Sequence, residues 1–395
     1  MALWRLMIAA QLFAVAAGGI YEPRQHQKPS KDGAVRVSSR AKIPASVNLS
    51  TTNDVYKRGS NAKFVGLNIC GFDFGCNKQG SCDIARIDAP LPNVPPAYSS
   101  PHEPLGNGPA QMLHFVSAHN FNIFRLPVSW QYLVDNVLGG PLDPTNFGYY
   151  DQLVRDCLAT GAYCMIDLHN YARWDGKMIG WDDDDGPSVW QFADLWGRLA
   201  ATYKDDDRVW FGIMNEPYDL PWLSLWRDTV QAAVTAIREA GATTQFISLP
   251  GRGYQSPGYL IDKGDGDALR QVTNPDGTTA NLVFDVHLYL DAEGSGKSSW
   301  CVTSGIQDNW APLAEWLREN GRQAIVSETG AGDTPSCEIY FCQQLQYLDD
   351  NSDVFLGYVV WAAGSFRSSY ELSMTPFVQG DYWKDVPLLT RCVSR

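Results

Sequence analysis

Eight short runs rich in β-branched and aromatic residues recur along this chain, and helical patterns separate most of them. Runs of this kind, bounded by Gly, Pro, Asn or Asp, are typical of buried strands. We predict strands over residues 64–72, 122–130, 163–170, 209–217, 246–251, 282–290, 323–330 and 355–364. We predict helices over residues 110–119, 149–160, 189–203, 223–240, 309–319 and 338–348. The connection 255–280 is rich in Gly and Asp, and its helical signal is weak.

This alternation of strands and helices favours the α/β class and a closed parallel barrel. Eight strands alternating with helices over roughly 300 residues are typical of a (β/α)8 TIM barrel. A doubly wound open sheet is the alternative. It is disfavoured because no predicted strand is followed by a GxGxxG or Walker-type phosphate loop. We therefore expect residues 63–395 to form a single catalytic domain of the barrel type.

Polar and aromatic side chains gather at the ends of six of the eight predicted strands. They are Arg125, His169, Asn170, Asn215, Glu216, His287, Tyr289, Glu328 and Trp361. In a (β/α)8 barrel the carboxyl ends of all strands meet at one face, and active sites lie there. Scattered structural residues would not choose the same end of every strand, so we interpret these side chains as one site.

Glu216 and Glu328 are candidates for a pair of catalytic carboxylates. Glycosidic cleavage needs one protonated acid for the leaving oxygen and one carboxylate that attacks or activates water. We assign Glu216 as the acid/base, since it follows Asn215, whose amide suits a sugar 2-hydroxyl. We assign Glu328 as the nucleophile, with Arg125 and Tyr289 as donors that keep it ionised. Each glutamate taken alone could instead be a structural carboxylate.

His169 and His287 lie at the same rim and are assigned to orienting sugar hydroxyls or the acid/base. No HExxH or carboxylate triplet supports a metal site, and no GxSxG elbow supports a serine hydrolase. We therefore expect neither a metal nor a cofactor. The run Asp182–Asp185 lacks EF-hand spacing, so we favour a solvated acidic loop over a calcium site.

Trp361 is the candidate platform for the sugar at the cleavage point, because an indole face stacks well on the C–H face of a sugar. Trp174 and Trp181 follow the third strand and are candidates for flanking subsites. Trp196 and Trp226 fall inside predicted helices and are expected in the core.

Residues 1–17 have the features of a secretory signal peptide, with Arg5 ahead of a short apolar run that ends in small residues. Residues 18–62 are rich in Pro, Ser, Lys and Arg and lack a hydrophobic period, which predicts a disordered leader or propeptide. Its Lys57-Arg58 pair is either a dibasic processing site or a solvated pair. The sequon at Asn48 is the one glycosylation site that the sequence predicts. We expect the protein to be secreted.

The formal net charge of −13 argues against nucleic acid and anionic membranes as partners. Because residues 20–63 contain nine Lys and Arg against three Asp and Glu, the rest of the chain is more acidic still. Such a surface repels nucleic acid and anionic membranes. No later segment approaches twenty uninterrupted apolar residues, so we expect no membrane span. We expect a monomer.

Nine cysteines and no CxxC pair argue against a zinc or thioredoxin-type motif. An oxidising compartment favours four disulfides and one free thiol. Cys76/Cys82 and Cys157/Cys164 are close enough in sequence for local disulfides. Cys70 lies in an apolar strand and is expected to be free.

Nine collinear segments between about residues 63 and 395 resemble the secreted fungal endo-β-1,4-glucanases of glycoside hydrolase family 5. They are GFDFGC, FRLPVSWQYL, DLHNYARW, FGIMNEP, VTAIREAGA, QFISLPG, NLVFDVHLYLD, RQAIVSETG and NSDVFLGYVVWAAGSF. The resemblance implies a (β/α)8 barrel and retaining hydrolysis of β-glucan, with Glu216 as acid/base and Glu328 as nucleophile. It implies a surrounding site of Arg125, His169, Asn215, His287, Tyr289 and Trp361. It also implies the disulfides Cys76–Cys82, Cys157–Cys164, Cys301–Cys337 and Cys342–Cys392.

The chain departs from many such relatives in one respect. No cysteine precedes Cys70, so the small cysteine-rich cellulose-binding module that many of them carry ahead of the barrel is absent from this sequence. Soluble or amorphous β-glucan is therefore the expected substrate. Mannan, xyloglucan and mixed-linkage glucan are the alternatives within the family. A sugar-binding barrel without catalysis is disfavoured because both glutamates are present.

Overall fold

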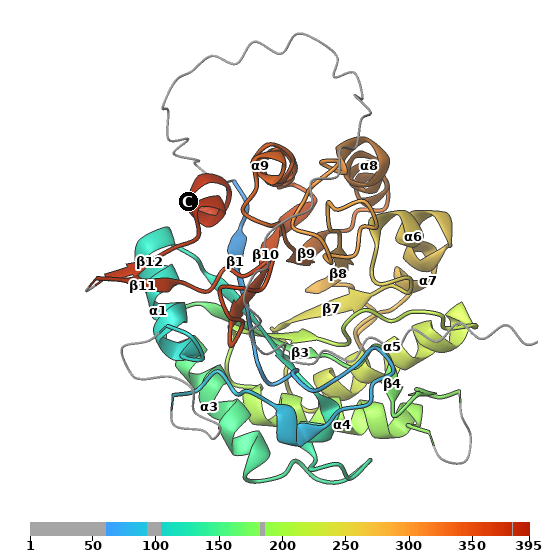
Figure 1. Cartoon of the computed structure of the whole chain (residues 1–395). Coiled ribbons are helices and arrows are strands. Elements are labelled where there is room, and N and C mark those ends of the chain that lie inside the picture. The colour runs from blue at the N-terminus through green and yellow to red at the C-terminus, as the bar shows by residue number, and fades with distance from the viewer. Residues whose placement is uncertain (1–60, 93–103, 182–185, 381) are drawn as a thin grey trace, which may run out of the picture. The chain divides into compact units, whose positions relative to one another are not determined.

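A closed barrel of eight parallel strands forms the centre of the protein (Figure 1). The computed structural model describes residues 61–92, 104–181, 186–380 and 382–395. In barrel order the strands are β1 (Phe64–Cys70), β10 (Phe355–Gly364), β9 (Ala324–Thr329), β8 (Leu282–His287), β7 (Phe246–Pro250), β6 (Val209–Gly212), β3 (Tyr163–Leu168) and β2 (Ile123–Val128). The predicted (β/α)8 architecture is confirmed.

Several predictions fall outside the described residues and stay predictions. They concern the signal peptide 1–17, all but the last two residues of the leader 18–62, the sequon at Asn48 and the acidic run Asp182–Asp185. Among the described residues, no helix has the length and apolar character needed to cross a membrane.

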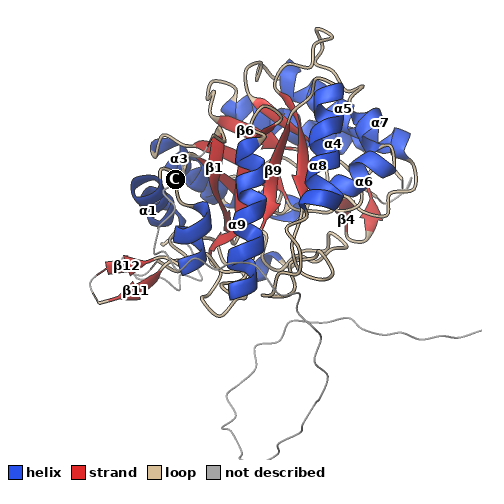
Figure 2. Ribbon diagram, turned by 90° about the horizontal axis from the view of Figure 1, so that it is seen from above, coloured by secondary structure: helices blue, strands red, loops and turns tan. Residues whose placement is uncertain are grey.

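Helices surround the barrel in the view of Figure 1, and Figure 2 shows them lying over the strands. They are α1 (Gly108–His119), α2 (Trp130–Leu133), α3 (Asn146–Ala159), α4 (Val189–Tyr203), α5 (Leu223–Glu239), α6 (Pro257–Asp262), α7 (Asp265–Leu269), α8 (Ala311–Glu319) and α9 (Pro335–Asp350). Short helical turns lie at Ile84–Arg86, Ile306–Trp310 and Leu389–Val393. Two antiparallel hairpins, β4–β5 (Arg173–Trp174 and Lys177–Met178) and β11–β12 (Phe377–Gln379 and Tyr382–Lys384), lie outside the barrel.

All of the predicted barrel strands except 355–364 were too long at their carboxyl ends. The prediction 209–217 is the clearest case, because β6 stops at Gly212 and Glu216 has a positive φ of 43° that no strand accommodates. Residues expected to close strands therefore lie in the loops that follow them. The weakly helical connection 255–280 contains α6 and α7, which are short.

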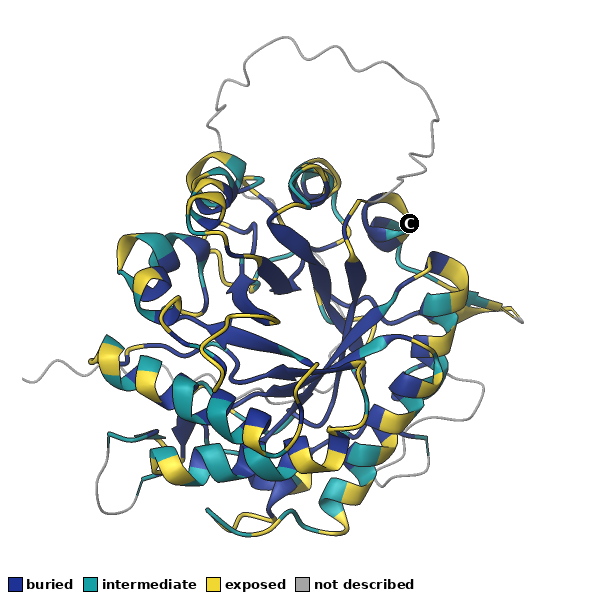
Figure 3. Cartoon of the chain, turned by 180° about the vertical axis from the view of Figure 1, so that it is seen from behind, coloured by how far each residue is buried: buried dark blue, intermediate teal, exposed yellow. Residues whose placement is uncertain are grey.

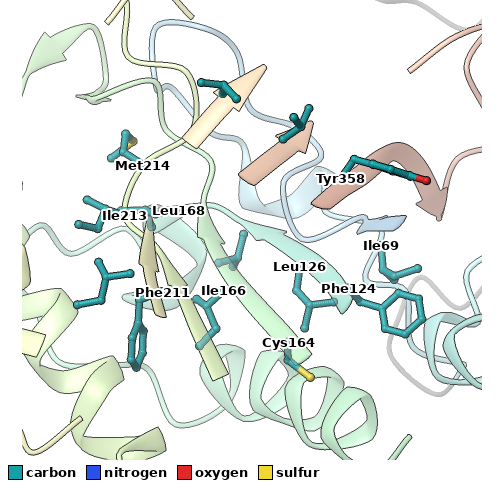
Figure 4. Packing of buried hydrophobic residues seen from close by; sticks show 14 of the residues in the cluster. Ile69, Phe124, Leu126, Cys164, Ile166, Leu168, Phe211, Ile213, Met214 and Tyr358 are labelled. Carbon is teal, nitrogen blue, oxygen red and sulfur yellow. The ribbon is translucent and has the colours of Figure 1, made fainter. Parts of the chain in front are cut away.

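Side chains on the outer face of the barrel pack against the helices and form the main core. Phe124 and Leu126 on β2, and Ile166 on β3, belong to this layer (Figure 4). Figure 3 shows the strands buried along their length, while each surrounding helix alternates buried and exposed faces. Trp196 and Trp226 are both buried in this core, as predicted.

The interior of the barrel consists of two layers that differ in chemistry. Eight buried apolar residues form a separate cluster at the amino-terminal half of the strands: Phe64, Ile123, Met165, Trp210, Val283, Ile325, Leu356 and Val359. Because side chains two apart in a strand share a face, the next inward positions lie above this layer. Those positions are polar, as Ile123 is followed by Arg125 and Met165 by Asp167. The apolar layer is therefore the floor beneath a polar one.

Four disulfides join the described cysteines in the pairing that the family resemblance implied. They are Cys76–Cys82, Cys157–Cys164, Cys301–Cys337 and Cys342–Cys392. Cys70 is free and buried, and burial raises the pKa of its thiol, so it stays protonated.

Candidate active site

Arg125 contacts four other residues of the polar layer inside the barrel. Its Nη1 donates to Asn68 Oδ1 at 2.8 Å and to Glu328 Oε2 at 2.9 Å. Its Nη2 donates to Asn215 Oδ1 at 2.6 Å and lies 2.9 Å from Asp167 Oδ1. This fully buried guanidinium is held in place by its Nη1 and Nη2 contacts, two of them to carboxylates, whereas its buried Nε has no partner among the described residues. Strands β1, β2, β3 and β9 are thereby tied together at the carboxyl end of the barrel.

Both oxygens of Glu328 have a donor. Tyr289 O–H donates to Oε1 at 2.7 Å, and Arg125 Nη1 donates to Oε2. Burial and the adjacent Glu328 charge raise the pKa of Tyr289 well above its ordinary value, so this phenol remains a donor. These two donors fix the orientation of the carboxylate.

Glu216 lies in the loop after β6, and its surroundings differ from those of Glu328. Its backbone N–H donates to Gln255 Oε1 at 2.6 Å, which holds the residue in its positive-φ conformation. Its Oε1 lies 3.2 Å from His287 Nδ1. Burial raises the pKa of Glu216 to about 7, although the charges of His169 and Arg125 oppose the shift. The carboxyl group can therefore carry a proton near neutral pH.

This raised pKa predicts a pH-dependent effect on stability. In the unfolded chain Glu216 titrates near its ordinary value of 4.5, whereas the folded protein retains the proton to about pH 7. The folded state binds more protons between these values, so this residue makes stability fall as pH rises through that window. Glu216→Gln removes the titration and should stabilise the protein at pH 8, relative to pH 4, by up to about 3 kcal/mol.

Urea unfolding at the two pH values measures this difference. Glu319→Gln on the exposed face of α8 is the matched control and should show no such dependence on pH. An equal effect of Glu216→Gln at pH 4 and pH 8 would contradict the assignment.

His287 connects the two glutamates. Its Nδ1 lies 3.2 Å from Glu216 Oε1 and 3.9 Å from Glu328 Oε2, and its Nε2 contacts Ser327 Oγ at 2.9 Å. Burial lowers the pKa of His287, although Glu328 and Asp285 oppose the shift. A neutral His287 imidazole can form a hydrogen bond with Glu216. Because it carries no charge, it does not offset the negative charge of Glu328.

His169 is oriented by a carboxylate below it. Its Nδ1 lies 2.8 Å from Asp167 Oδ2, and its Nε2 lies 3.2 Å from Asn215 Nδ2. Burial disfavours protonation of His169, but the hydrogen bond and charge of Asp167 outweigh it and raise the pKa. Trp361 stacks on the His169 ring, with centroids 5.6 Å apart and planes 19° apart. Trp361 Nε1 donates to Tyr370 O–H at 3.0 Å, which fixes the indole at the rim.

Two of the predicted site residues lie apart from the glutamate pair. Asn170 accepts from the Trp130 backbone N–H at 2.7 Å and donates to Gln131 Oε1 at 2.8 Å, so it anchors the start of α2. Trp174 is buried and packs edge-on against Trp130 with centroids 5.4 Å apart. The Asn170 side chain is fully buried and therefore has no surface for a ligand.

Trp181 instead packs against Trp222, with ring centroids 3.8 Å apart. Both rings line a shallow apolar pocket with Leu220 and Pro221 from the loop after β6. Trp222 is exposed, and this pair remains the candidate for an outlying subsite.

Sequence reasoning missed several residues of the polar layer. They are Asn68, Asp167, Asp285, Ser327 and Gln255. The first four are polar residues inside apolar runs at inward-facing positions, which is a signal that could have found them. Gln255 lies in an irregular loop, and no local pattern marks it.

Glu216, His287 and Glu328 each place one ligand atom so that the three atoms lie within 4.8 Å of one another. An oxygen of Glu216 therefore lies within 4.8 Å of an oxygen of Glu328. A cation there would compete with the Arg125 guanidinium, 2.9 Å from Glu328. The arrangement therefore favours proton transfer and nucleophilic attack at one point between the carboxylates.

Comparisons with known proteins agree with this geometry. The model of the family described as Cellulase (glycosyl hydrolase family 5) matches residues 93–364. The chain is 53% identical over 336 residues to Endoglucanase EG-II of Hypocrea jecorina, covering 85% of this chain and 78% of that protein. The crystal structure of Cel5A (EG2) from the same fungus superposes with a TM-score of 0.81 over 85% of this chain and 99% of that chain.

A more distant structure also matches. XacCel5A in complex with cellopentaose is 31% identical, with a TM-score of 0.70 over 84% of this chain and 99% of that chain. Matches of this extent, together with the closed barrel, show the family. The chain belongs to the cellulases of glycosyl hydrolase family 5 and is a glycoside hydrolase.

Proposed function

We propose that the protein is a retaining endo-β-1,4-glucanase with Glu216 as acid/base and Glu328 as nucleophile. The observation that carries the proposal is the approach of the two carboxylates to within 4.8 Å. Carboxyl groups separated by about 5–5.5 Å fit double displacement, whereas inverting enzymes need roughly 6.5–9.5 Å to admit a water. Relatives named endoglucanase and a neighbour holding cellopentaose support a β-1,4-glucan as the substrate.

In the first step Glu328 attacks the anomeric carbon while Glu216 protonates the departing glycosidic oxygen. Arg125 and Tyr289 hold the attacking carboxylate in position, and burial raises the pKa of Glu216 to about 7, so that it can donate a proton. The amide of Asn215 is fixed by Arg125 and His169, and its second N–H is available to a sugar hydroxyl.

In the second step Glu216, now ionised, removes a proton from water, which attacks the anomeric carbon of the glycosyl ester and releases the Glu328 carboxylate. His287 Nδ1 lies 3.2 Å from Glu216 Oε1 and can stabilise the ionised carboxylate by donating its N–H. Trp361 provides the stacking face for the sugar at the cleavage point, beside His169. Two inversions give net retention.

The glutamate pair does not distinguish β-glucan from mannan, xyloglucan or mixed-linkage glucan, because the same chemistry serves all four. Hydrolysis of carboxymethyl-cellulose against galactomannan separates them, and activity on mannan alone would overturn the glucanase proposal. Anomeric NMR of the first product tests the mechanism, since retention requires the β-anomer to appear before mutarotation. An initial α-anomer would exclude double displacement.

Tyr289→Phe should lower kcat roughly 10- to 100-fold and change KM little, because it removes one hydrogen bond to a charged group. The bond in question is the 2.7 Å contact with Glu328. Steady-state kinetics on a soluble β-glucan measures the effect. Tyr382→Phe, at a highly exposed position on β12, is the matched control and should behave as wild type. A Tyr289→Phe variant with unchanged kcat would show that this donor is dispensable.

We further propose that the protein acts outside the cell on polysaccharide. Four disulfides and fungal endoglucanase relatives support this location. Sequencing the amino terminus of the exported protein tests cleavage after residue 17 and after Arg58.

A further inference from the structure

A second cluster of metal-ligating side chains joins α1 to the end of the chain. His114 and His119 come from α1, and Asp385 directly follows β12. His114 Nε2 lies 2.9 Å from Asp385 Oδ1, and His119 Nε2 lies 2.9 Å from Oδ2. One ligand atom from each residue lies within 4.8 Å of the others. Figures 1 and 2 both show the β11–β12 hairpin beside α1.

The cluster lies at the opposite end of the barrel from the glutamate pair. Helix α1 returns to the start of β2, so its last residue, His119, is near the amino-terminal ends of the strands. The neighbouring Arg395 side chain donates to the backbone oxygen of Ala62, just before β1. Catalytic groups of this fold lie at the other face. A ligand here would therefore not touch the catalytic carboxylates.

Two imidazole nitrogens and one carboxylate oxygen are a donor set that suits zinc and related transition metals. Bonds of 2.0–2.2 Å at tetrahedral angles place neighbouring ligand atoms about 3.3 Å apart. The two histidine–aspartate distances of 2.9 Å would need to open by only a few tenths of an ångström. Water would complete the coordination from the solvent side, where the His114 side chain is 22% exposed.

A supporting contact orients one of the ligands. His119 Nδ1 lies 3.0 Å from Ser394 Oγ, which can accept its N–H. With the proton on Nδ1, the lone pair of Nε2 faces the Asp385 carboxylate and is free to bind a cation. With the proton on Nε2, the imidazole donates directly to Asp385 Oδ2 and no ion is needed. Metal-ligating histidines usually donate their other N–H to such an acceptor. The catalytic triplet differs, because Arg125 already supplies a positive charge to Glu328.

We propose that His114, His119 and Asp385 bind a divalent transition-metal cation of the zinc class and clamp the carboxyl-terminal segment onto α1. No sequence pattern indicated this cluster, because Asp385 is 266 residues from His119. The cation binds the folded protein at residues that the unfolded chain does not hold together, so it stabilises the fold.

The test uses the full secreted protein, stripped with EDTA, dialysed and titrated with zinc chloride. We expect one zinc ion per chain by elemental analysis. We expect a rise in unfolding temperature of roughly 5 °C at zinc concentrations near 100 times Kd, and no rise with magnesium. His114→Gln and Asp385→Asn should each abolish the bound zinc and the thermal shift. If Asp385→Asn fails to fold, the partly exposed His114→Gln still decides.

Two control variants make the result specific. Asp353→Asn removes an exposed carboxylate that pairs with Arg318 and should bind zinc as wild type does. Glu328→Gln should also retain the zinc, because it alters only the catalytic triplet. Zinc lost from Glu328→Gln but kept by His114→Gln would overturn the proposal, as would the absence of bound zinc in the wild-type protein. The second result would identify the cluster as a hydrogen-bonded histidine–aspartate contact without an ion.

Discussion

Glu328→Gln should reduce kcat on β-glucan by roughly 10⁵-fold or more, the largest effect that we expect from a single substitution. The amide cannot form the glycosyl ester, and loss of a nucleophile removes the whole covalent route. The amide can still accept from Arg125 and contact Tyr289, so the fold should be preserved. Single-turnover hydrolysis of a soluble cello-oligosaccharide measures the loss.

Binding and folding controls separate chemistry from misfolding. Calorimetry should give a Kd for cellopentaose within about tenfold of wild type, since the stacking face of Trp361 is untouched. Glu319→Gln, on α8 and exposed, should keep full activity. A Glu328→Gln variant retaining even a hundredth of wild-type kcat would refute the assignment of this residue as nucleophile.

Glu216→Ala should lower kcat on β-glucan by about 10²–10⁴-fold, the range typical of general acid–base catalysis. The loss should depend on the leaving group. A glycoside with a dinitrophenolate leaving group needs no protonation, so its first step should proceed at a near-normal rate and the ester should accumulate. We expect kcat/KM of the wild type to fall above the Glu216 pKa of about 7, and the variant should lose this fall.

Azide supplies the decisive measurement for this residue. It attacks the accumulated ester without general-base assistance, so it should restore turnover and yield a β-glycosyl azide in Glu216→Ala. It should do nothing for Glu328→Gln, in which no ester forms. An α-configured azide product from Glu216→Ala, or azide rescue of Glu328→Gln, would reverse the assignments of acid/base and nucleophile.

The sequence predicted the barrel because alternation of apolar runs and helical patterns is a local signal. The prediction was accurate for α4 and β10, whose bounds match the expected ranges. It also brought Arg125, Glu216, His287 and Glu328 to one point, since the fold collects strand ends at a single face. Periodicity does not mark where a strand ends and a loop begins, so the predicted strand ran to Pro217, whereas β6 ends at Gly212.

The direction of their side chains explains why two predicted site residues lie apart from the glutamate pair. Asn170 and Trp174 follow the same strand as His169, but their side chains turn toward Trp130 instead of the mouth of the barrel. Adjacency in sequence does not determine the direction of a side chain in a loop. Gln255, which holds the backbone of Glu216, is 39 residues from it and comes from a different loop. Such pairings depend on the closed barrel and could not be found before the fold was known.

The apolar layer formed by Phe64, Trp210 and their neighbours has a consequence for turnover. It blocks the barrel from below, so the water that hydrolyses the proposed ester must arrive through the opening by which the cleaved chain departs. Solvent and sugar therefore compete for one passage. At high substrate concentration, sugar hydroxyls should therefore compete with water for the glycosyl ester. Some chains should then be lengthened while others are cut.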